Sequence, residues 1–275
     1  VIRPSDGKNG LAPSNLVKKK KPGDYRMIGD FCRRNKNTRT VRYLIPRLDD
    51  IVQELLGSKV FASADMLKGY WQMLVAEESR GYFAFLTPFG IYEYCRVPMG
   101  ACNSGPHFQR CMQEILRELL YSGLLQYLDD SLLYAKDENE LLARLDRYFT
   151  LLRQHGIKLH PSKMDFYATE LTWAGKRISA DGVKVAPERV AALNGMPEPK
   201  TADQLMQFVY GAAWVRGNIP EFARIAAGCY DTINAALEGQ KRRTKRAASR
   251  KKLDELPIWR ESGRESYMAL KKALR

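Results

Sequence analysis

Two adjacent carboxylates, Asp129 and Asp130, are the residues of this sequence that most clearly suggest chemistry. Mostly apolar residues precede them over 124–128 and follow them over 132–134, which predicts a β-hairpin with both acids at its tight turn. Two like charges this close repel each other, and they are tolerated when water solvates them or a divalent cation neutralises them. Asp is also common in ordinary surface turns, so the pair alone leaves both interpretations open.

A third acid, Asp65, ends the strand-like run of residues 60–64. Three carboxylates carried by strand ends could hold two magnesium ions, the arrangement that drives in-line displacement at a phosphoryl group. Because the acids lie far apart in the sequence, the elements around them must place the two segments side by side.

Two helices and two further strands complete this arrangement. Residues 104–121 carry apolar side chains at helical spacing with Ser104 as a cap, and residues 137–155 form a second expected helix. Strand-like runs follow near Ile157 and Phe166. The order is the split β-α-β-β-α-β arrangement of ferredoxin-like folds. In it, the strand that ends at Asp65 can lie beside the hairpin, so the three acids are expected to meet.

The net charge favours a polyanionic partner. The 275 residues include 45 Lys and Arg against 31 Asp and Glu, which gives a net charge of +14. Such an excess is typical of proteins that bind nucleic acid, although a generic basic surface gives the same balance.

The cysteines and histidines form no zinc-binding pattern, because the five cysteines make no C-x-x-C pair and there are three histidines. A scattered, odd set suggests reduced thiols in an intracellular protein. The sequence contains no apolar stretch long enough to span a membrane and no signal peptide. Because the chain begins at Val1 rather than Met, we expect a piece of a longer protein.

Basic and turn-rich segments surround these elements. Residues 17–26 predict a hairpin whose lysine-rich bend would suit phosphates, with a solvated charge run as the alternative. Residues 82–100 predict strands and turns in a lobe over the site. After residue 180 we expect a separate helical subdomain, and residues 241–252, of which eight are basic, predict a solvated linker or an exposed helix.

Seven blocks, taken in order, resemble the reverse transcriptase of long-terminal-repeat retrotransposons of the gypsy type. Any one block is weak, but seven in the family's order are specific. They are LVKKKKPGDYRMIGDFCRRNKNT, FASADMLKGYWQM, TPFGIYEYCRVPMGACNSGPHFQRCM, YLDD, LHPSKMDF, LTWAGKRIS and MPEPKTADQLMQFVYGAAWVRGNIPEFA.

The resemblance implies an α+β right-hand polymerase with fingers, a ferredoxin-like palm and a helical thumb. The implied segments are 1–40 (fingers, truncated at the N-terminus), 41–72 (first part of the palm), 73–103 (fingers insertion), 104–181 (rest of the palm with the YLDD hairpin and the primer grip), 182–235 (thumb) and 236–275 (basic linker and start of the connection).

The implied activity is that of an RNA-directed DNA polymerase, which extends a primer annealed to RNA or DNA with deoxynucleotides. The chain would be a fragment of a Pol polyprotein that continues into RNase H and integrase segments, in a cytoplasmic particle or the nucleus. No membrane partner is expected, and the sequence leaves open whether the chain dimerises. Two alternatives are an inactive nucleic-acid-binding or structural subunit and an RNA-dependent RNA polymerase.

The resemblance also implies metal ligands. Asp65, Asp129 and Asp130, with the backbone carbonyl of Met66, would hold two Mg²⁺ ions, with Mn²⁺ as an alternative metal. The resemblance supports the metal-ligand roles of Asp65 and Asp129 most firmly. For Asp130, a partly structural role is the alternative.

Further residues match the family's nucleotide-binding positions. Lys163 matches the lysine proposed to protonate pyrophosphate as a general acid. Tyr70 matches the aromatic gate, whose ring would clash with a ribose 2′-hydroxyl. Arg26 and one of Lys20 or Lys21 match the cations that bind the triphosphate, with the lysine register left open by the variable hairpin length.

Two more sets of positions match the family. Met99 stands in the floor of the nucleotide pocket, where relatives often carry Phe or Gln, so this floor is expected to differ. The primer grip matches a hairpin made by Trp173, Ala174, Gly175 and Lys176. By residue type alone, Trp173 could equally serve packing.

Overall fold

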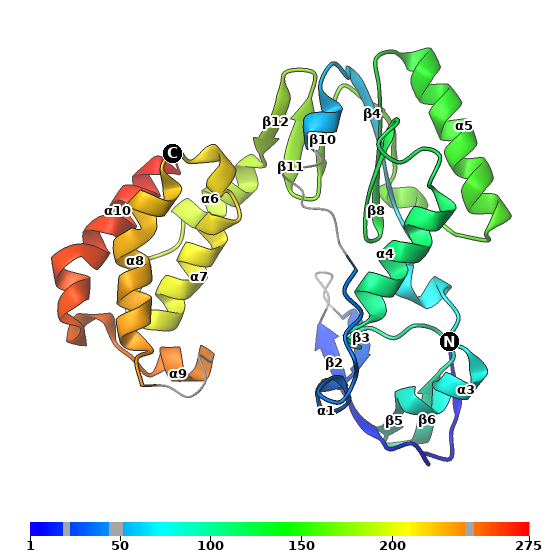
Figure 1. Cartoon of the computed structure of the whole chain (residues 1–275), viewed down its shortest axis with the longest axis horizontal. Helices are drawn as coiled ribbons and strands as arrows, with labels where there is room; N and C mark the ends of the chain where they lie inside the picture. Colours follow the sequence, from blue (N-terminus) through cyan, green and yellow to red (C-terminus); the bar gives the residue numbers. More distant parts are fainter. Residues whose placement is uncertain (19–22, 44–51, 240–244, 275) are drawn as a thin grey trace. The chain divides into compact units, whose positions relative to one another are not determined.

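The computed structural model describes residues 1–18, 23–43, 52–239 and 245–274, with the backbone alone at 52–53 and 245–246 (Figure 1). The chain divides into two compact units. The first comprises Val1–Ala174 and Ser179–Gly182, and the second comprises Gly175–Ile178 and Val183–Arg275.

An antiparallel sheet of the first unit carries the three acids, with strand order β7-β8-β4-β9. Its elements in chain order are β4 (Val60–Asp65), α4 (Ser104–Ile115), β7 (Leu124–Tyr127), β8 (Asp130–Ala135), α5 (Glu138–Gln154) and β9 (Asp165–Ala168). This is the split β-α-β-β-α-β layout, so the predicted ferredoxin-like palm is confirmed. The strand expected near Ile157 was wrong, because the chain there makes only an isolated bridge between Met66 and Leu159.

Alternation along β4 explains how the sheet meets its helices. Val60, Ala62 and Ala64 point to one face and are buried in the same cluster as Phe108 of α4 and Tyr148 of α5. Small side chains at the two alanines leave room for these aromatic rings. The helices thereby fix the position of the strand that delivers Asp65.

The two helices begin in different ways. Asp137 caps α5, because its carboxylate accepts a hydrogen bond from the backbone N–H of Glu140 at 3.0 Å. Ser104 does not cap α4, contrary to our expectation: its hydroxyl donates to the Pro98 carbonyl at 2.6 Å. α4 also ends before residue 121, because the backbone N–H of Leu119 bonds to the carbonyl of Leu116 in a tighter turn.

A second sheet of the first unit has the order β1-β6-β5-β2-β3. Its strands are β1 (Ile2–Pro4), β2 (Ala12–Lys18), β3 (Tyr25–Gly29), β5 (Ala84–Thr87) and β6 (Gly90–Tyr94). The predicted N-terminal hairpin is confirmed, since β2 and β3 pair as far as Lys18 and Tyr25. Lys20 and Lys21 lie outside the described residues.

Short helical segments connect these strands. They are α1 (Cys32–Asn35), α3 (Glu77–Arg80) and the single turns η1 (Val52–Leu55), η2 (Gly69–Gln72), η3 (Gly81–Phe83) and η4 (Pro161–Lys163). Three strands follow as consecutive neighbours in one sheet: β10 (Glu170–Trp173), β11 (Lys176–Ser179) and β12 (Gly182–Val185).

The second unit is mainly helical (Figure 1). It contains α6 (Pro187–Asn194), α7 (Ala202–Ala213), α8 (Phe222–Ala236), α9 (Lys245–Ser249), η6 (Leu253–Glu255), the π-helical turn η7 (Trp259–Gly263) and α10 (Arg264–Ala273). Among the described helices, none combines the length and the apolar character needed to cross a membrane.

One core crosses the boundary that we predicted between a thumb at 182–235 and a linker with connection at 236–275. Phe208 of α7 lies in the same buried cluster as Tyr267 and Leu270 of α10. The ring centroids of Phe208 and Tyr267 are 4.6 Å apart. Apolar residues within a basic segment therefore join α10 to the helical unit, while the six-segment division itself stays a prediction.

Candidate active site

The three acids meet at one end of the palm sheet. Asp65, the last residue of β4, stands opposite Asp130, the first residue of β8. Asp130 also pairs with Tyr127, which leaves Leu128 and Asp129 as the two loop residues of the β7–β8 hairpin. The backbone N–H of Met66 donates to the Asp129 carbonyl at 2.9 Å. The predicted convergence of β4 and the hairpin is therefore confirmed.

Close approach of a neighbouring segment confines Asp129. A methyl group built at Gly69 of η2 would lie 3.2 Å from Asp129 Cβ, so only glycine fits there without a shift. Leu128 adopts a left-handed φ of 52°, which is uncommon for a residue with a side chain. The turn is thus held in a specific and strained conformation.

Burial and mutual repulsion disfavour the charged forms of the hairpin acids. Burial raises the pKa of Asp130 to about 6, and the charges of Asp129 and Asp65 add to this rise. Burial likewise raises the pKa of Asp129, with Asp65 contributing, while Lys163 and Arg26 oppose the rise. A divalent cation would relieve this concentration of negative charge.

Lys163 is tied to the end of β4. Its Nζ lies 3.0 Å from Asp65 Oδ2, and the two side chains are 56% and 22% exposed. The backbone N–H of His160 donates to the Asp65 carbonyl at 2.8 Å, and the Lys163 N–H donates to His160 at 3.0 Å. The segment that we predicted to carry a general acid therefore reaches the carboxylates.

The donor set suits a hard cation, although its side chains do not form a complete metal cluster as they stand. Among the described residues, no three His, Cys, Asp or Glu side chains are arranged to hold a metal ion. The Asp65 carboxylate is instead paired with Lys163. Carboxylate oxygens are the ligands that Mg²⁺ prefers. The Met66 carbonyl accepts a long 3.4 Å bond from Gly69, and its ligand role stays a prediction.

Tyr70 and Arg26 lie near the acids. The Tyr70 ring packs edge-on against Phe108 of α4 with centroids 5.2 Å apart. Burial raises the pKa of Tyr70, and the charge of Asp129 contributes to the rise. Arg26 is exposed on β3 and its charge lowers the pKa of Asp129. Both residues are therefore close enough to Asp129 for their electrostatic influence on it, or its influence on them, to be felt, while their roles at a nucleotide stay predictions.

The predicted primer grip is a tight turn. Ala174 and Gly175 both have left-handed φ values, 47° and 78°, the pattern of a two-residue type I′ hairpin. Trp173 is 6% exposed, so packing accounts for much of its side chain. A methyl group built at Gly175 would lie 2.6 Å from the Arg189 guanidinium, a neighbour that our sequence analysis missed. Met99 is half-buried, one residue beyond Pro98.

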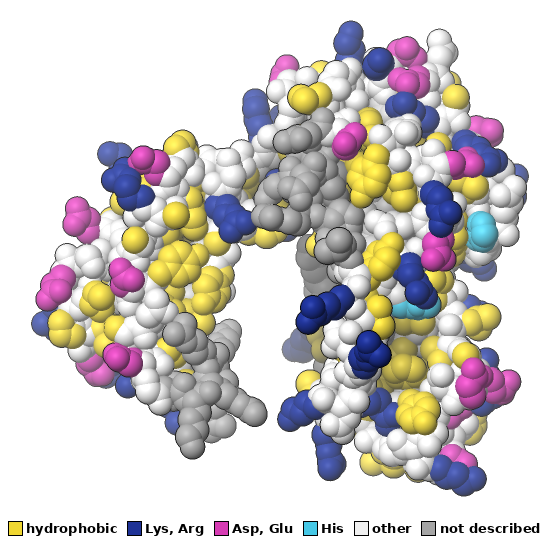
Figure 2. All heavy atoms as spheres, viewed as in Figure 1, with side chains coloured by type: hydrophobic (Ala, Val, Ile, Leu, Met, Phe, Trp, Pro, Cys, Tyr) yellow, Lys and Arg dark blue, Asp and Glu magenta, His cyan; other side chains and the backbone are white. Residues whose placement is uncertain are grey.

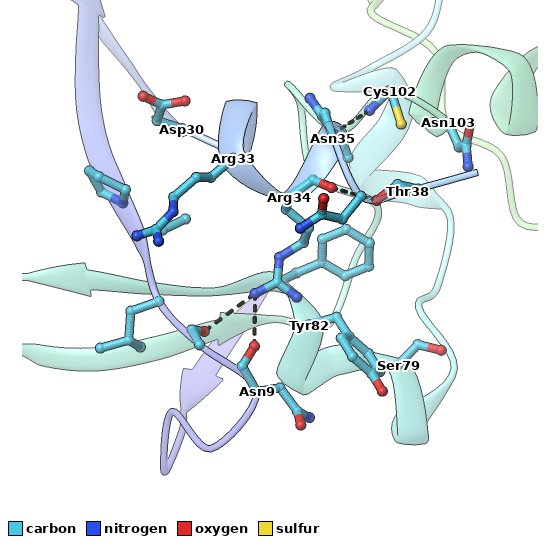
Figure 3. Close-up of a pocket in the computed structure, with 17 residues that line it drawn as sticks. Asn9, Asp30, Arg33, Arg34, Asn35, Thr38, Ser79, Tyr82, Cys102 and Asn103 are labelled. Carbon is cyan, nitrogen blue, oxygen red and sulfur yellow. Dashed lines mark hydrogen bonds between the residues drawn. The ribbon is translucent and has the colours of Figure 1, made fainter. Parts of the chain in front are cut away.

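A separate pocket of about 900 Å³ lies in the first unit, in the region predicted as fingers (Figure 3). Arg34 donates to the Asn9 carbonyl at 3.0 Å, and its guanidinium carbon lies 5.7 Å from the centroid of the Tyr82 ring. The Thr38 hydroxyl donates to the Arg34 carbonyl at 2.9 Å. The lining residues include none of the three acids, and several of their polar groups serve to hold the pocket itself together.

Residues 17–178 match the family model described as reverse transcriptase (RNA-dependent DNA polymerase), which is more than half of the chain. The chain belongs to the reverse transcriptase family. Membership in this family implies dependence on divalent metal ions in general.

Retrotransposon polyproteins are among the most similar relatives. The chain is 36% identical over 202 residues to the retrovirus-related Pol polyprotein from transposon 297 of Drosophila melanogaster. This match covers 74% of this chain and 19% of the relative. It is 29% identical over 280 residues to the Pol polyprotein from transposon gypsy of the same species, covering 100% of this chain and 26% of the relative. The predicted gypsy-type reverse transcriptase domain is thereby confirmed, and the chain spans about a fifth to a quarter of these polyproteins.

Solved structures confirm the right-hand polymerase fold. The foamy viral protease-reverse transcriptase in complex with double-stranded DNA superposes with a TM-score of 0.83 at 21% identity, over 99% of this chain and 45% of that one. The foamy viral protein in complex with an RNA/DNA hybrid gives 0.74 at 23% identity, over 82% of this chain and 30% of that one. At this identity the likeness concerns the fold of the reverse transcriptase family.

Sequence reasoning missed the residues that hold the hairpin turn. Gln109, Gln126 and Ser131 are buried polar side chains at 0%, 2% and 0% exposure. Gln126 interrupts the apolar run of residues 124–128, and an isolated amide in a buried strand is the signal that could have found it.

Proposed function

We propose that this chain is an RNA-directed DNA polymerase that adds deoxynucleotides to a primer annealed to an RNA or DNA template. One observation carries the proposal: Asp65 and Asp130 stand opposite each other, with Asp129 in the adjoining turn, in a member of the reverse transcriptase family. Lys and Arg side chains on the visible surface of both units suit a polyanionic partner (Figure 2).

Asp65, Asp129 and Asp130 would hold two Mg²⁺ ions, or Mn²⁺, with the Met66 carbonyl as a further ligand. When bound, such ions would supply activation of a primer 3′-hydroxyl and charge stabilisation for the leaving pyrophosphate. The chain's own contribution is to hold the carboxylates together at a half-buried sheet end, where their charge attracts the ions.

Other residues serve the nucleotide. Lys163, beside Asp65, protonates the leaving pyrophosphate. Arg26, with Lys20 or Lys21, binds the triphosphate, and a guanidinium can do so with two parallel hydrogen bonds. The ring of Tyr70 excludes a ribose 2′-hydroxyl.

The remaining assignments concern the pocket floor, the primer and the wider protein. Met99 forms the floor of the nucleotide pocket, and Trp173 to Lys176 contact the primer end. Relatives named as Pol polyproteins support further segments in the same polyprotein, which we propose to be RNase H and integrase. A cytoplasmic particle or the nucleus is the proposed location. The foamy viral structures with DNA and with an RNA/DNA hybrid support a template with annealed primer as the partner.

Extension of oligo(dT) on poly(rA) tests the proposal. We expect dTTP incorporation that depends on divalent metal and is abolished in the Asp129→Asn variant. Asp146→Asn, which removes an exposed carboxylate of α5, is the matched control and should retain activity. Binding of primer and template without extension would support the inactive subunit, and preferred use of UTP would support an RNA polymerase.

A further inference from the structure

Two glutamines hold the strained turn residue at both of its backbone groups. The Leu128 N–H donates to Gln109 Oε1 at 2.7 Å. The Leu128 carbonyl accepts a hydrogen bond from Gln126 Nε2. Leu128 directly precedes Asp129. These two bonds therefore set the backbone direction at Asp129, whose carboxylate we propose as a metal ligand.

The orientation of both amides follows from their partners. Gln126 must present its NH₂ group to the Leu128 carbonyl, so its oxygen faces the hydroxyl of Ser131, which must donate. Gln109 presents its NH₂ group to the Gln126 carbonyl at 3.1 Å, so its oxygen faces the Leu128 N–H. A carbonyl cannot donate, and this fixes each amide in one orientation.

The chain of donors begins on α5. Because Ser131 uses its one proton toward Gln126, it must accept from the Tyr148 hydroxyl, which lies 2.8 Å away. Donation therefore runs from Tyr148 through Ser131 and Gln126 to the Leu128 carbonyl. Tyr148 and Ser131 are both 0% exposed, so water does not compete for these groups.

This donor chain links α5 to the hairpin turn indirectly, through Ser131 and Gln126. Tyr148 bonds to Ser131, which follows Asp130 in β8, and Gln126 belongs to β7. Gln109 closes the arrangement from α4. Each side of the hairpin is therefore fastened to a helix, and the turn conformation depends on whether the donors stay aligned.

We propose that Tyr148 and Ser131 are positioning residues, which act through Gln126 to fix the Leu128–Asp129 turn in the geometry that binds divalent metal. The inference rests on the proposed function and goes beyond it, because it gives a role in metal affinity to two residues that cannot touch the metal, template or nucleotide. A purely structural role in the core is the competing explanation, and it predicts lost stability without a change in metal affinity.

The test measures Mn²⁺ binding by electron paramagnetic resonance, on the chain bound to a chain-terminated primer, its template and dTTP. Tyr148→Phe removes only the hydroxyl, and Ser131→Ala removes the next member of the chain. Partners that orient metal ligands typically affect affinity by about 10-fold to 100-fold, so we expect each variant to weaken Mn²⁺ binding by about 10-fold. Because both changes cut one chain, the double variant should be close to either single variant.

Tyr267→Phe is the matched control. Its ring is 1% exposed in the second unit, and its hydroxyl lies 3.5 Å from the Pro197 carbonyl. This variant removes the same atom from an equally buried ring and should bind Mn²⁺ as the wild type does. Adding it to Tyr148→Phe should give additive changes in unfolding free energy, since the two sites share no partner.

The outcomes separate this inference from the proposed function. Mn²⁺ binding that survives in Tyr148→Phe, Ser131→Ala and the double variant would overturn the positioning role, even if all three are less stable. If Asp129→Asn also leaves Mn²⁺ binding unchanged, the metal site itself is wrong and the proposed function fails with it. Weakened binding in both single variants and in the double variant to the same degree, with Tyr267→Phe unaffected, supports the inference.

Discussion

We expect the Gly69→Ala substitution to slow primer extension without unfolding the chain. A methyl group at Gly69 would lie 3.2 Å from Asp129 Cβ and 3.6 Å from Phe108 Cζ. Carbon atoms in ordinary contact are about 3.5–4.0 Å apart, so Asp129 would have to move by roughly 0.3–0.8 Å. The turn cannot relax freely, because the backbone N–H and carbonyl of Leu128 are both bonded to buried glutamines.

The size of this displacement sets the expected loss. A misplacement of about 1 Å can cost about 10²-fold in rate. If the logarithm of the loss grows in proportion to the shift, roughly 0.3–0.8 Å lowers kcat by about 4-fold to 40-fold. Gly69 does not have a positive φ, so alanine adds no backbone strain, and crowding alone costs about 1–3 kcal/mol of stability.

Steady-state extension of oligo(dT) on poly(rA) at saturating dTTP gives kcat, and thermal denaturation gives Tm. Gly217→Ala is the control, because a methyl group built at Gly217 meets no atom within 4 Å. A wild-type kcat in Gly69→Ala, with Tm unchanged, would refute the reasoning, since Asp129 would then tolerate a closer neighbour without losing its function.

Lys163→Met removes the cation 3.0 Å from Asp65, and since both groups are partly exposed, we expect the unfolding free energy from urea denaturation to fall by about 1 kcal/mol or less. The rate of single-turnover extension should fall by about 10²-fold. Tyr70→Ala should raise the use of UTP relative to dTTP by about 10-fold or more, measured as the ratio of kcat/KM values. Asp137→Ala removes the cap of α5 and should lower the unfolding free energy from urea denaturation by about 1 kcal/mol, while kcat stays unchanged. In EDTA, Asp130→Asn should be more stable than the wild type above pH 6. Burial raises the pKa of Asp130 to about 6, so the folded chain binds that proton more tightly than the unfolded chain does. Wild-type stability therefore falls as pH rises from about 4 to 6. Thermal denaturation across this range should show the two proteins converging below about pH 4.

Local patterns in the sequence predicted the order of the palm elements and most of their positions. A strand-like run of mostly apolar residues predicted the strand that ends at Asp65, and apolar residues at helical spacing predicted α5 almost to its ends. The end of α4 could not be predicted in the same way, because the apolar spacing continues to Leu120 while the backbone tightens into turns after Ile115. Periodicity reports which side chains are buried, and it does not distinguish a helix from a turn that buries the same residues.

The charged residues of the candidate site could be predicted from the sequence, whereas its buried polar residues could not. Acids that break apolar runs stand out in a sequence, so Asp65 and the pair at 129–130 were found. Tyr148 and Ser131 resemble ordinary residues of an amphipathic helix and a strand, and their bond joins elements that only the tertiary fold brings together. Arg189 escaped for the same reason: its guanidinium lies 3.8 Å from the centroid of the Trp214 ring, a contact between α6 and the end of α7.

The hairpin end of the palm sheet breaks several rules of a stable sheet at once. Asp65 and Asp130 are like charges directly opposite each other on paired strands, which is unfavourable. Leu128 takes a left-handed φ, which costs about 1–2 kcal/mol. The polar groups directly behind the turn, by contrast, are buried and bonded to one another. Strain and repulsion that persist only because the surroundings impose them are typical of functional sites. These unfavourable features of the hairpin fall on the residues that we propose to bind metal and on their neighbour, and we infer that the ordered network behind them allows them to persist.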